Sequence, residues 1–477
     1  MELSEKERNQ WGSKLGFLLA AIGSAVGLGN IWGFPYKMGA TGGFGFLLVY
    51  VILAVLVGVV MLSTELAIGR KTQKSPVLAY REMGKGPFKF LGWLAVLSPF
   101  VIIFFYFVLG GYCLEYMTLN LSEIGFFDGA IPTGDESFGP MLTNPVGCII
   151  FAALFVAITL FINGKDLTAG IERFSEIGMP ALVVLLFIII IRSVSLDGAA
   201  EGLEFMFKPD WSQFDSFGKV IHVLAVSGSQ MFFSLSLAMG IMITYGSYLP
   251  KHENIVKSSV IIVVCDTLVA IMAGLAVIPA SFALGGSDAA MAGPKLLFVT
   301  MQNVFSEMGQ IGAVFGVLFY LFVIIAALSS CVSIFEVLLA YICDDREAKG
   351  KPADRTKVTW TVGAIVSLGA ILVAADGLGS NGLWLPLQEQ LGVLGFNDCW
   401  LDFFDCLSEG IMMPLGACLM AVLIGWVIKP KSVLGEIGAG DKYNLFYKIS
   451  IKFICPVVMF FVLLGQISSF FGLGWFE

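Results

Sequence analysis

Charge is scarce in this sequence. Only 13% of its 477 residues are Asp, Glu, Lys or Arg, whereas soluble proteins carry roughly 25%. Hydrophobic residues make up 57% of the chain, and the mean hydropathy is +0.87. These values exclude an ordinary soluble domain and predict an all-α protein that crosses the membrane several times.

Metal-binding and catalytic patterns are also lacking. The two histidines, His222 and His252, are far apart, and the nine cysteines do not have the spacing of metal ligands. No Ser/His/Asp, HExxH or paired-Asp pattern occurs at membrane depth, so we expect no enzyme. The mixed-charge N-terminus argues against a cleavable signal peptide. Nothing in the sequence resembles a nucleic-acid-binding surface.

Apolar runs of spanning length predict eleven transmembrane helices in one membrane domain, residues 1–477. They lie at about 14–38, 44–69, 90–118, 145–163, 174–194, 217–249, 257–284, 311–343, 358–376, 404–428 and 451–475. With a cytoplasmic N-terminus, 23 of the 28 Lys and Arg residues fall on the inner side, as the positive-inside rule requires. The odd number of spans then places Glu477 outside. We expect a multi-pass protein of the plasma (cytoplasmic) membrane.

The first span is interrupted by Gly23-Ser-Ala-Val-Gly-Leu-Gly-Asn30, followed by Phe34-Pro-Tyr36. Unwound backbone at mid-membrane must find polar partners, which would indicate a cavity that holds an ion or a charged group. Close packing of helices through small residues is the other interpretation. Asn30 and Pro35 favour the cavity.

The sixth span has a similar interruption, from Ser227 to Gly240. Interrupted helices at corresponding positions of two inverted halves are typical of a transporter site at the midplane. We therefore predict a 5+5 inverted repeat, with repeat 1 at about 11–195 and repeat 2 at about 215–430. The helix at about 451–475 would be an accessory.

Polar residues also occur within the seventh and eighth spans. Asp266 is an intramembrane carboxylate, which is a functional candidate by default, although an acid that snorkels to an interface is the alternative. Ser329 and Ser330 are weaker candidates, because serine often bonds back to its own helix. Three intramembrane or near-interface glutamates are interpreted as helix-packing or network residues: Glu65, Glu115 and Glu336.

These motifs together resemble the neurotransmitter:sodium symporter family, in particular its bacterial amino-acid transporters of LeuT-type fold, over nearly the whole chain. The strongest marks are Gly23-x-Ala-Val-Gly-Leu-Gly-Asn30 with Phe34-Pro-Tyr36, Gln230-x-Phe-Phe-Ser-Leu-Ser236 and Leu328-Ser-Ser330. Further marks are Arg8-x-x-Trp11, Tyr106 with Tyr112, and Leu401-Asp-x-x-Asp405. The resemblance implies broken helices 1 and 6 and a Na⁺-coupled symporter that imports an amino acid by alternating access.

The resemblance also implies two sodium sites and a substrate pocket. The first sodium ion would be held by Ala25, Asn30, Ser234 and Asp266, together with the substrate carboxylate. The second would be held by Gly23, Val26, Ala326, Ser329 and Ser330. The pocket would be lined by Ser24, Ala25, Leu28, Gly29, Ile102, Tyr106, Phe233, Ser234, Ser236, Met239, Ser330 and Ile334.

Three of these positions bear on specificity. Chloride-dependent members have Asn where this chain has Asp266 and Ser where it has Ala270, so the resemblance implies chloride independence, with Asp266 supplying the negative charge. Protonation of Asp266 after ion release, and hence proton antiport, is a further hypothesis. Monoamine-transporting relatives have Asp where this chain has Gly27. Because this chain lacks that Asp, an amino acid with its own carboxylate is favoured over a monoamine. The apolar lining of the pocket further favours a neutral hydrophobic or aromatic L-amino acid.

Two gates follow from the same resemblance. The inner gate would pair Arg8 with Asp344, near Trp11 and Tyr248. The outer gate departs from the family, because Gly33 replaces the usual Arg. Lys37, four residues on, could pair with Asp405 instead, or Asp405 could be hydrated in the vestibule.

Two other classes of membrane protein, a sensor and a channel, are alternatives to the symporter. A membrane sensor of the same fold would bind the amino acid without net transport, and it typically carries a signalling domain, which we do not expect here. A channel is disfavoured, because gates at both ends imply occlusion. The sequence does not indicate an oligomeric state.

Overall fold

Long helices form almost the whole molecule. The computed structural model describes residues 10–124, 131–290, 295–383 and 399–476, and no strand occurs among them. Nine helices of this part of the chain are long and apolar enough to cross a membrane, or ten if one bent pair counts as a single span. The predicted span at 217–249 is not among them, because the structure divides it into two shorter helices.

Residues 10–207 contain ten helices that the structure describes. They are α1 (Lys14–Ala25), α2 (Phe34–Thr41), α3 (Phe44–Leu53), α4 (Val59–Thr72), α5 (Pro76–Met83), α6 (Leu91–Glu123), α7 (Gly134–Leu142), α8 (Pro145–Asn163), α9 (Arg173–Val194) and α10 (Ala199–Phe207).

The rest of the chain adds eleven described helices. They are α11 (Phe217–Ser234), α12 (Ile241–Gly246), α13 (Ile255–Ala290), α14 (Met301–Glu307), α15 (Gly312–Ala348), α16 (Arg355–Asp376), α18 (Trp400–Asp405), α19 (Met413–Val422), α20 (Lys431–Ile437), α21 (Asp441–Ile449) and α22 (Cys455–Phe470). The helices α5, α7, α10, α14, α20 and α21 are short and lie outside the predicted spans.

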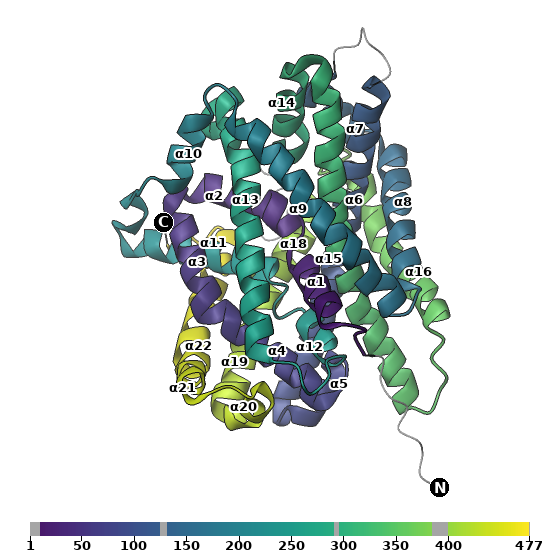
Figure 1. The fold of residues 1–477 in the computed structure, drawn as a ribbon, viewed down its shortest axis with the longest axis vertical. Coiled ribbons are helices and arrows are strands. Elements are labelled where there is room, and N and C mark those ends of the chain that lie inside the picture. The colour runs from purple at the N-terminus through teal and green to yellow at the C-terminus, as the bar shows by residue number, and fades with distance from the viewer. Residues whose placement is uncertain (1–9, 125–130, 291–294, 384–398, 477) are drawn as a thin grey trace.

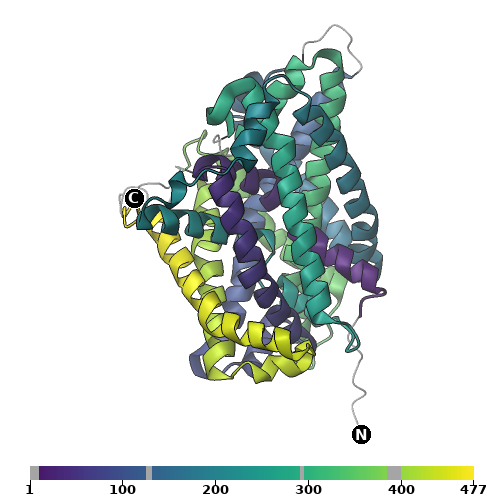
Figure 2. The ribbon, with the colours of Figure 1, turned by 60° about the vertical axis from the view of Figure 1, so that its left-hand side comes forward.

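The two ends of the molecule differ in the segments that form them. The helices α5 and α20, from segments rich in Lys and Arg, lie at one end, and α7, α10 and α14 lie at the opposite end (Figure 1). In the interior, α15 packs along α6, and α8 and α16 pack beside them. The helix α22 runs along the edge of the bundle (Figure 2). It belongs to the candidate span Asp441–Phe470, and only 22% of an apolar 18-residue stretch of this span is buried.

The first interruption lies at the predicted place. The helix α1 ends at Ala25, and Val26 takes an extended conformation with φ −78° and ψ 92°. A π-helical segment, η1 (Gly29–Gly33), then leads into α2. The two parts are bent by 46° relative to each other, which frees backbone groups in the interior of the bundle.

The second interruption separates α11 from α12. Between Ser234 and Ile241, three residues take left-handed conformations, Ser236 (φ 52°), Ala238 (φ 61°) and Gly240 (φ 74°). Such angles are unfavourable for residues other than glycine and need support from their surroundings. Part of that support comes from Glu65 of α4, whose carboxylate accepts a hydrogen bond from the Ala238 N–H at 2.6 Å.

We predict that Glu65→Leu destabilises this interruption. The substitution leaves the buried Ala238 N–H without its acceptor, at a cost of about 1–3 kcal/mol. The expected result is a lower thermal unfolding temperature in detergent, with Glu65→Gln close to wild type because its amide oxygen can still accept.

The matched control is Glu115→Leu. Glu115 is another glutamate in an apolar helix. The Oε2 atoms of both residues have no hydrogen-bond partner within the described ranges, but only Glu65 accepts the hydrogen bond from the Ala238 N–H. Equal unfolding temperatures for the two Leu variants would contradict the role given to Glu65.

Candidate functional site

A buried carboxylate lies where the two interruptions meet α13. Asp266 of α13 has no exposed surface. Its Oδ1 accepts hydrogen bonds from Asn30 Nδ2 at 2.8 Å and Ser234 Oγ at 3.0 Å, and its Oδ2 accepts from Ser234 Oγ at 2.9 Å and Tyr50 Oη at 3.2 Å. The sequence predicted Asp266, Asn30 and Ser234 for the first sodium site, and the structure brings all three side chains together.

All of these donors are neutral. No ion pair to Asp266 occurs in the part of the chain that the structure describes. A buried charge is stable only when it is paired or binds a cation. The residues around Asp266 supply oxygen atoms from a carboxylate, an amide and hydroxyls, which are the ligands of a hard cation such as Na⁺. Groups of three or more His, Cys, Asp or Glu that could hold a metal are absent from the described residues.

The residues predicted for the second sodium site lie between α1 and α15. A Cβ atom at Gly23 would be 3.3 Å from Ser329 Cβ, so these two residues are adjacent. The Ser329 hydroxyl donates to the Ala326 carbonyl at 2.8 Å within α15, and the Ser330 hydroxyl donates to the Ser24 carbonyl at 3.1 Å. Val26 follows at the end of α1. Ser329 and Ser330 of α15 therefore lie beside the end of α1.

The predicted substrate residues meet at the same break. The Tyr106 hydroxyl of α6 accepts a hydrogen bond from the Leu28 N–H at 2.9 Å. The Ser236 hydroxyl donates to the Ser24 carbonyl at 2.9 Å, which joins the two interruptions. The rings of Tyr106 and Phe233 lie 6.5 Å apart between centroids.

Close approach at Gly27 and Gly29 makes this arrangement possible. A Cβ at Gly27 would be 2.1 Å from Ser330 Oγ and 2.5 Å from Tyr106 Oη, and a Cβ at Gly29 would be 2.7 Å from Phe233 Cδ1. No side chain fits at Gly27 without displacing these groups. The other predicted lining residues are all buried: Ala25, Ile102, Met239 and Ile334.

Trp11 forms contacts at the end of the site that the Lys and Arg distribution predicts to be cytoplasmic, called the inner end below. The Trp11 N–H donates to the Tyr248 carbonyl at 3.3 Å, and the Trp11 indole N–H donates to the Tyr245 carbonyl at 3.1 Å. The predicted inner-gate residue Asp344 accepts a hydrogen bond from the Ser75 N–H at 2.7 Å. Its predicted partner Arg8 lies outside the described residues.

A second ion pair at this end was not predicted. The Glu336 carboxylate of α15, which has no exposed surface, accepts from Arg355 Nη2 at 2.6 Å and Arg355 Nη1 at 3.1 Å, and from the Tyr248 hydroxyl at 2.9 Å. The sequence indicated Glu336 only as a network residue. Nothing in the sequence indicated Arg355 as the partner of Glu336, because Arg355 begins a helix after a polar loop.

The prediction for the outer gate needs a correction. Lys37 forms its ion pair with Glu409, not with Asp405. Glu409 lies one helical turn after Asp405, and its Oε1 also accepts a hydrogen bond from Ser229 Oγ at 2.8 Å. No ion pair between Lys37 and the predicted partner Asp405 occurs among the described residues. Lys37 therefore contacts this acidic helix at a different turn than the sequence suggested.

Two further residues were missed because nothing in the sequence marks them. Tyr50 lies in an uninterrupted apolar run, yet its hydroxyl contacts both Asp266 and Ser234. Glu172, at the end of the π-helical segment η4 (Thr168–Glu172), accepts hydrogen bonds from the Gly12 N–H and the Ser13 hydroxyl, both at 2.9 Å. Glu172 therefore holds the start of α1.

A sequence model of the sodium:neurotransmitter symporter family matches residues 8–125 and 131–476. The chain is similar to an uncharacterized sodium-dependent transporter of Bacillus subtilis, with 33% identity over 98% of this chain and 99% of the other. It is also similar to the sodium- and chloride-dependent glycine transporter 1 of Xenopus laevis, with 24% identity over 97% of this chain and 79% of the other. A crystal structure of MhsT in complex with L-phenylalanine superimposes with a TM-score of 0.85 and 36% identity, over 96% of this chain and all of the other. The fold is therefore the predicted LeuT-type fold.

We predict that Glu336→Gln loosens the inner end. It replaces the buried partner of Arg355 by a neutral amide, and breaking a buried ion pair costs about 3 kcal/mol or more. Hydrogen exchange should show faster exchange of the backbone amides of α12 and of residues 11–14.

The control is Asp345→Asn. Asp345 is on the same helix and pairs with Lys349, whose side chain is 61% exposed, and exposed pairs contribute little. Equal exchange in the two variants would show that the Glu336 pair does not hold the inner end.

Proposed function

Because the chain belongs to the sodium:neurotransmitter symporter family, whose members are sodium-coupled transporters, we propose that it imports a neutral, hydrophobic or aromatic L-amino acid together with Na⁺. Transport would proceed by alternating access, with the site exposed first to one side of the membrane and then to the other. The N-terminus would be cytoplasmic, as the Lys and Arg distribution predicts.

The observation that carries this proposal is the environment of Asp266. Its carboxylate is fully buried and is surrounded by neutral donors from three other helical segments. Binding of Na⁺ would supply the missing positive charge. The ligands would be Asp266, Asn30, Ser234 and the Ala25 carbonyl, with the carboxylate of the substrate completing the set.

A second sodium ion would use the oxygen atoms between α1 and α15. The carbonyls of Gly23, Val26 and Ala326 and the hydroxyls of Ser329 and Ser330 form this set. In this structure both hydroxyls donate to carbonyls. Rotation of each hydroxyl about its C–O bond would turn an oxygen lone pair toward the ion. The two ions would share the unwound end of α1, which links them to the substrate.

The substrate would lie against the same unwound segment. Tyr106 would donate its O–H to the substrate carboxylate, and this is supported by its hydroxyl oxygen already accepting from the Leu28 N–H, which leaves the O–H available. Phe233 would cover the substrate, and Ile102, Met239 and Ile334 would surround its side chain with apolar groups. The bound L-phenylalanine of MhsT supports an amino acid of this kind.

Chloride independence is part of the proposal. Relatives include a chloride-dependent transporter, so family membership does not decide the point. In this chain the fixed carboxylate of Asp266 would supply the negative charge, and Ala270, one turn later and fully buried, has no group that binds an anion.

We predict Na⁺-driven uptake of L-phenylalanine into proteoliposomes, equal in chloride and in gluconate. Asp266→Asn should reduce uptake at least about tenfold, because the ion and the substrate then lose their mutual coupling. Adding Ala270→Ser to Asp266→Asn should restore part of the uptake in chloride only.

Asp215→Asn is the control, since Asp215 is exposed and pairs with Lys219 on the surface. Uptake that needs chloride in the wild type would overturn the role of Asp266. Na⁺-dependent binding without accumulation would instead favour a sensor.

We predict separately that Gly27→Ala weakens L-phenylalanine binding about tenfold or more. The added methyl group would overlap Ser330 Oγ and Tyr106 Oη, and overpacking of this kind costs about 1–3 kcal/mol. Gly139→Ala is the control, because nothing lies within 4 Å of a Cβ there. Equal affinities for the two variants, measured by equilibrium binding in Na⁺, would contradict the placement of the substrate.

A further inference from the structure

A cavity lies between α2, α11 and α22, toward the end of the molecule that the Lys and Arg distribution predicts to be outside. Its volume is about 360 Å³, which is within the range of pockets that bind small molecules. Three of its lining residues are exposed, Ala40, His222 and Ser469, whereas Thr41 and Ser468 are buried. The cavity therefore reaches the surface and has hydroxyl groups in its interior.

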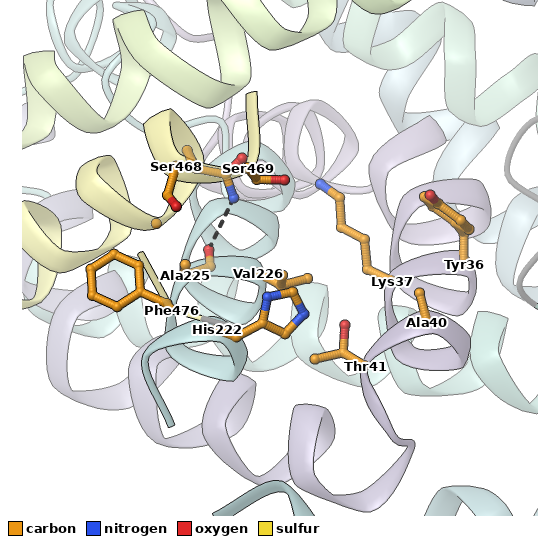
Figure 3. Close-up of a pocket in the computed structure, with 12 residues that line it drawn as sticks. Tyr36, Lys37, Ala40, Thr41, His222, Ala225, Val226, Ser468, Ser469 and Phe476 are labelled. Atoms are coloured by element: carbon orange, nitrogen blue, oxygen red, sulfur yellow. Dashed lines mark hydrogen bonds between the residues drawn. The ribbon is translucent and has the colours of Figure 1, made fainter. Parts of the chain in front are cut away.

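The polar groups of the cavity are rich in hydrogen-bond donors. Lys37 contributes an ammonium group, His222 an imidazole, and Ser469 a hydroxyl group. Figure 3 shows the Lys37 side chain reaching from α2 toward Ser469 of α22, with the His222 ring of α11 facing the same space. Among the described residues that line the cavity, none is Asp or Glu. The lining therefore suits a ligand that accepts hydrogen bonds.

The ion pair of Lys37 decides what charge such a ligand can carry. An ammonium group has three N–H donors, and the printed contacts of the described residues give Lys37 one acceptor, Glu409 Oε1. Two donors thus remain for a ligand in the cavity. Because the carboxylate of Glu409 offsets the charge of Lys37, a singly charged acceptor fits better than a doubly charged one. A phosphate diester, the group found in phospholipids, carries one negative charge.

Exposed tryptophans indicate that the cavity lies at the level of the lipid headgroups. Trp211 and Trp475 are 60% and 54% exposed, and tryptophan is enriched at the membrane–water interface. The Trp475 N–H donates to Ser468 Oγ in the cavity at 3.0 Å. Two residues after Trp211, Gln213 contacts the turn that follows Thr41, since a Cβ at Gly42 would lie 2.6 Å from its Nε2. Both tryptophans are therefore close neighbours of the cavity.

We propose that this cavity binds the headgroup of a phospholipid from the outer leaflet of the membrane. The phosphate diester would accept hydrogen bonds from Lys37, His222 and Ser469. The acyl chains would run along α22, which lies at the edge of the bundle (Figure 2) and belongs to a span that is largely unburied. The proposal concerns lipid binding alone and does not depend on the transport function proposed above.

The first test is native mass spectrometry of the purified, delipidated protein titrated with dihexanoylphosphatidylglycerol. Saturable binding is expected. His222→Leu combined with Ser469→Ala should weaken binding about tenfold, because two hydrogen bonds to a charged group are lost. Ala40→Trp keeps every donor but fills the cavity from an exposed position, and it should abolish binding. Equal affinity of the wild type and these variants would overturn the proposal.

The second test uses the two histidines of the chain, His222 and His252. Both are exposed, and His252 lines a different cavity, near Trp11, so it serves as a control within the same molecule. Modification of each imidazole by diethyl pyrocarbonate is followed by peptide mass spectrometry. At a lipid concentration about tenfold above its Kd, modification of His222 should slow about tenfold, because only the unliganded fraction reacts. Unchanged modification of His222, or equal slowing at His252, would overturn the proposal.

Two further ligands test the source of the phosphate. Dihexanoylglycerol has the same acyl chains without phosphate, and it should bind at least about tenfold more weakly. Equal binding would show that apolar contacts alone hold the lipid and would overturn the proposal. Inorganic phosphate should not protect His222. Protection at the same concentration as the lipid would assign the cavity to a free anion and would overturn the lipid assignment.

The matched control variant is Lys208→Gln. Lys208 follows α10 at the same end of the molecule (Figure 1), and its side chain is 70% exposed in a surface pair with Glu204. Removal of this charge should leave lipid binding unchanged. A loss as large as that caused by His222→Leu with Ser469→Ala would show general attraction of the lipid to surface charge and would overturn the site.

Discussion

The structure depends on one constraint, the burial of Asp266 away from water and from any described cationic side chain. A carboxylate in the interior of a helix bundle needs donors or a cation. Asn30, Tyr50 and Ser234 come from three different segments to meet it. Asn30 can do so only because α1 has ended at Ala25, and Ser234 is the last residue of α11. The two helix breaks and the buried acid therefore depend on one another. Each break brings a polar group to Asp266, and Asp266 holds each break in place.

The same contacts connect the proposed ion ligands to the proposed substrate pocket. Asn30 Oδ1 accepts a hydrogen bond from the Gly27 N–H at 3.2 Å, and the next amide, that of Leu28, donates to Tyr106 at 2.9 Å. An ion that draws Asn30 Oδ1 toward itself would release the Gly27 N–H beside the residue that binds Tyr106. Asn30, a proposed ion ligand, is thus separated by only two peptide units of unwound backbone from Leu28, which binds Tyr106 of the proposed pocket. Coupling over so short a path needs no long-range network.

The sequence was most informative where local chemistry conflicts with a membrane helix. Glycines and serines in apolar runs predicted both interruptions, and a carboxylate within an apolar helix marked Asp266 as a functional candidate. The partners of these residues were less predictable, because they depend on packing between distant segments. Tyr50 lies 216 residues from Asp266 and looks like an ordinary apolar-run aromatic. Glu409 and Asp405 lie one helical turn apart. Which of them pairs with Lys37 depends on how the helices pack, and the spacing of residues in the sequence does not determine that. The inverted repeat and the count of eleven spans stay predictions.

The two ends of the site are held in different ways, and this bears on how the molecule would move. At the end predicted to be cytoplasmic, Glu172 and Glu253 both bind residues 12–14 at the start of α1, and Glu336 binds Tyr248 and Arg355. At the opposite end, polar contacts of α2 and α11 meet at one oxygen atom of Glu409. The contacts at one end are thus spread over several carboxylates, and those at the other end converge on one. On the proposed function, a cation bound at Asp266 would add contacts to both broken helices from within the bundle, because Asn30 and Ser234 already bond to that carboxylate.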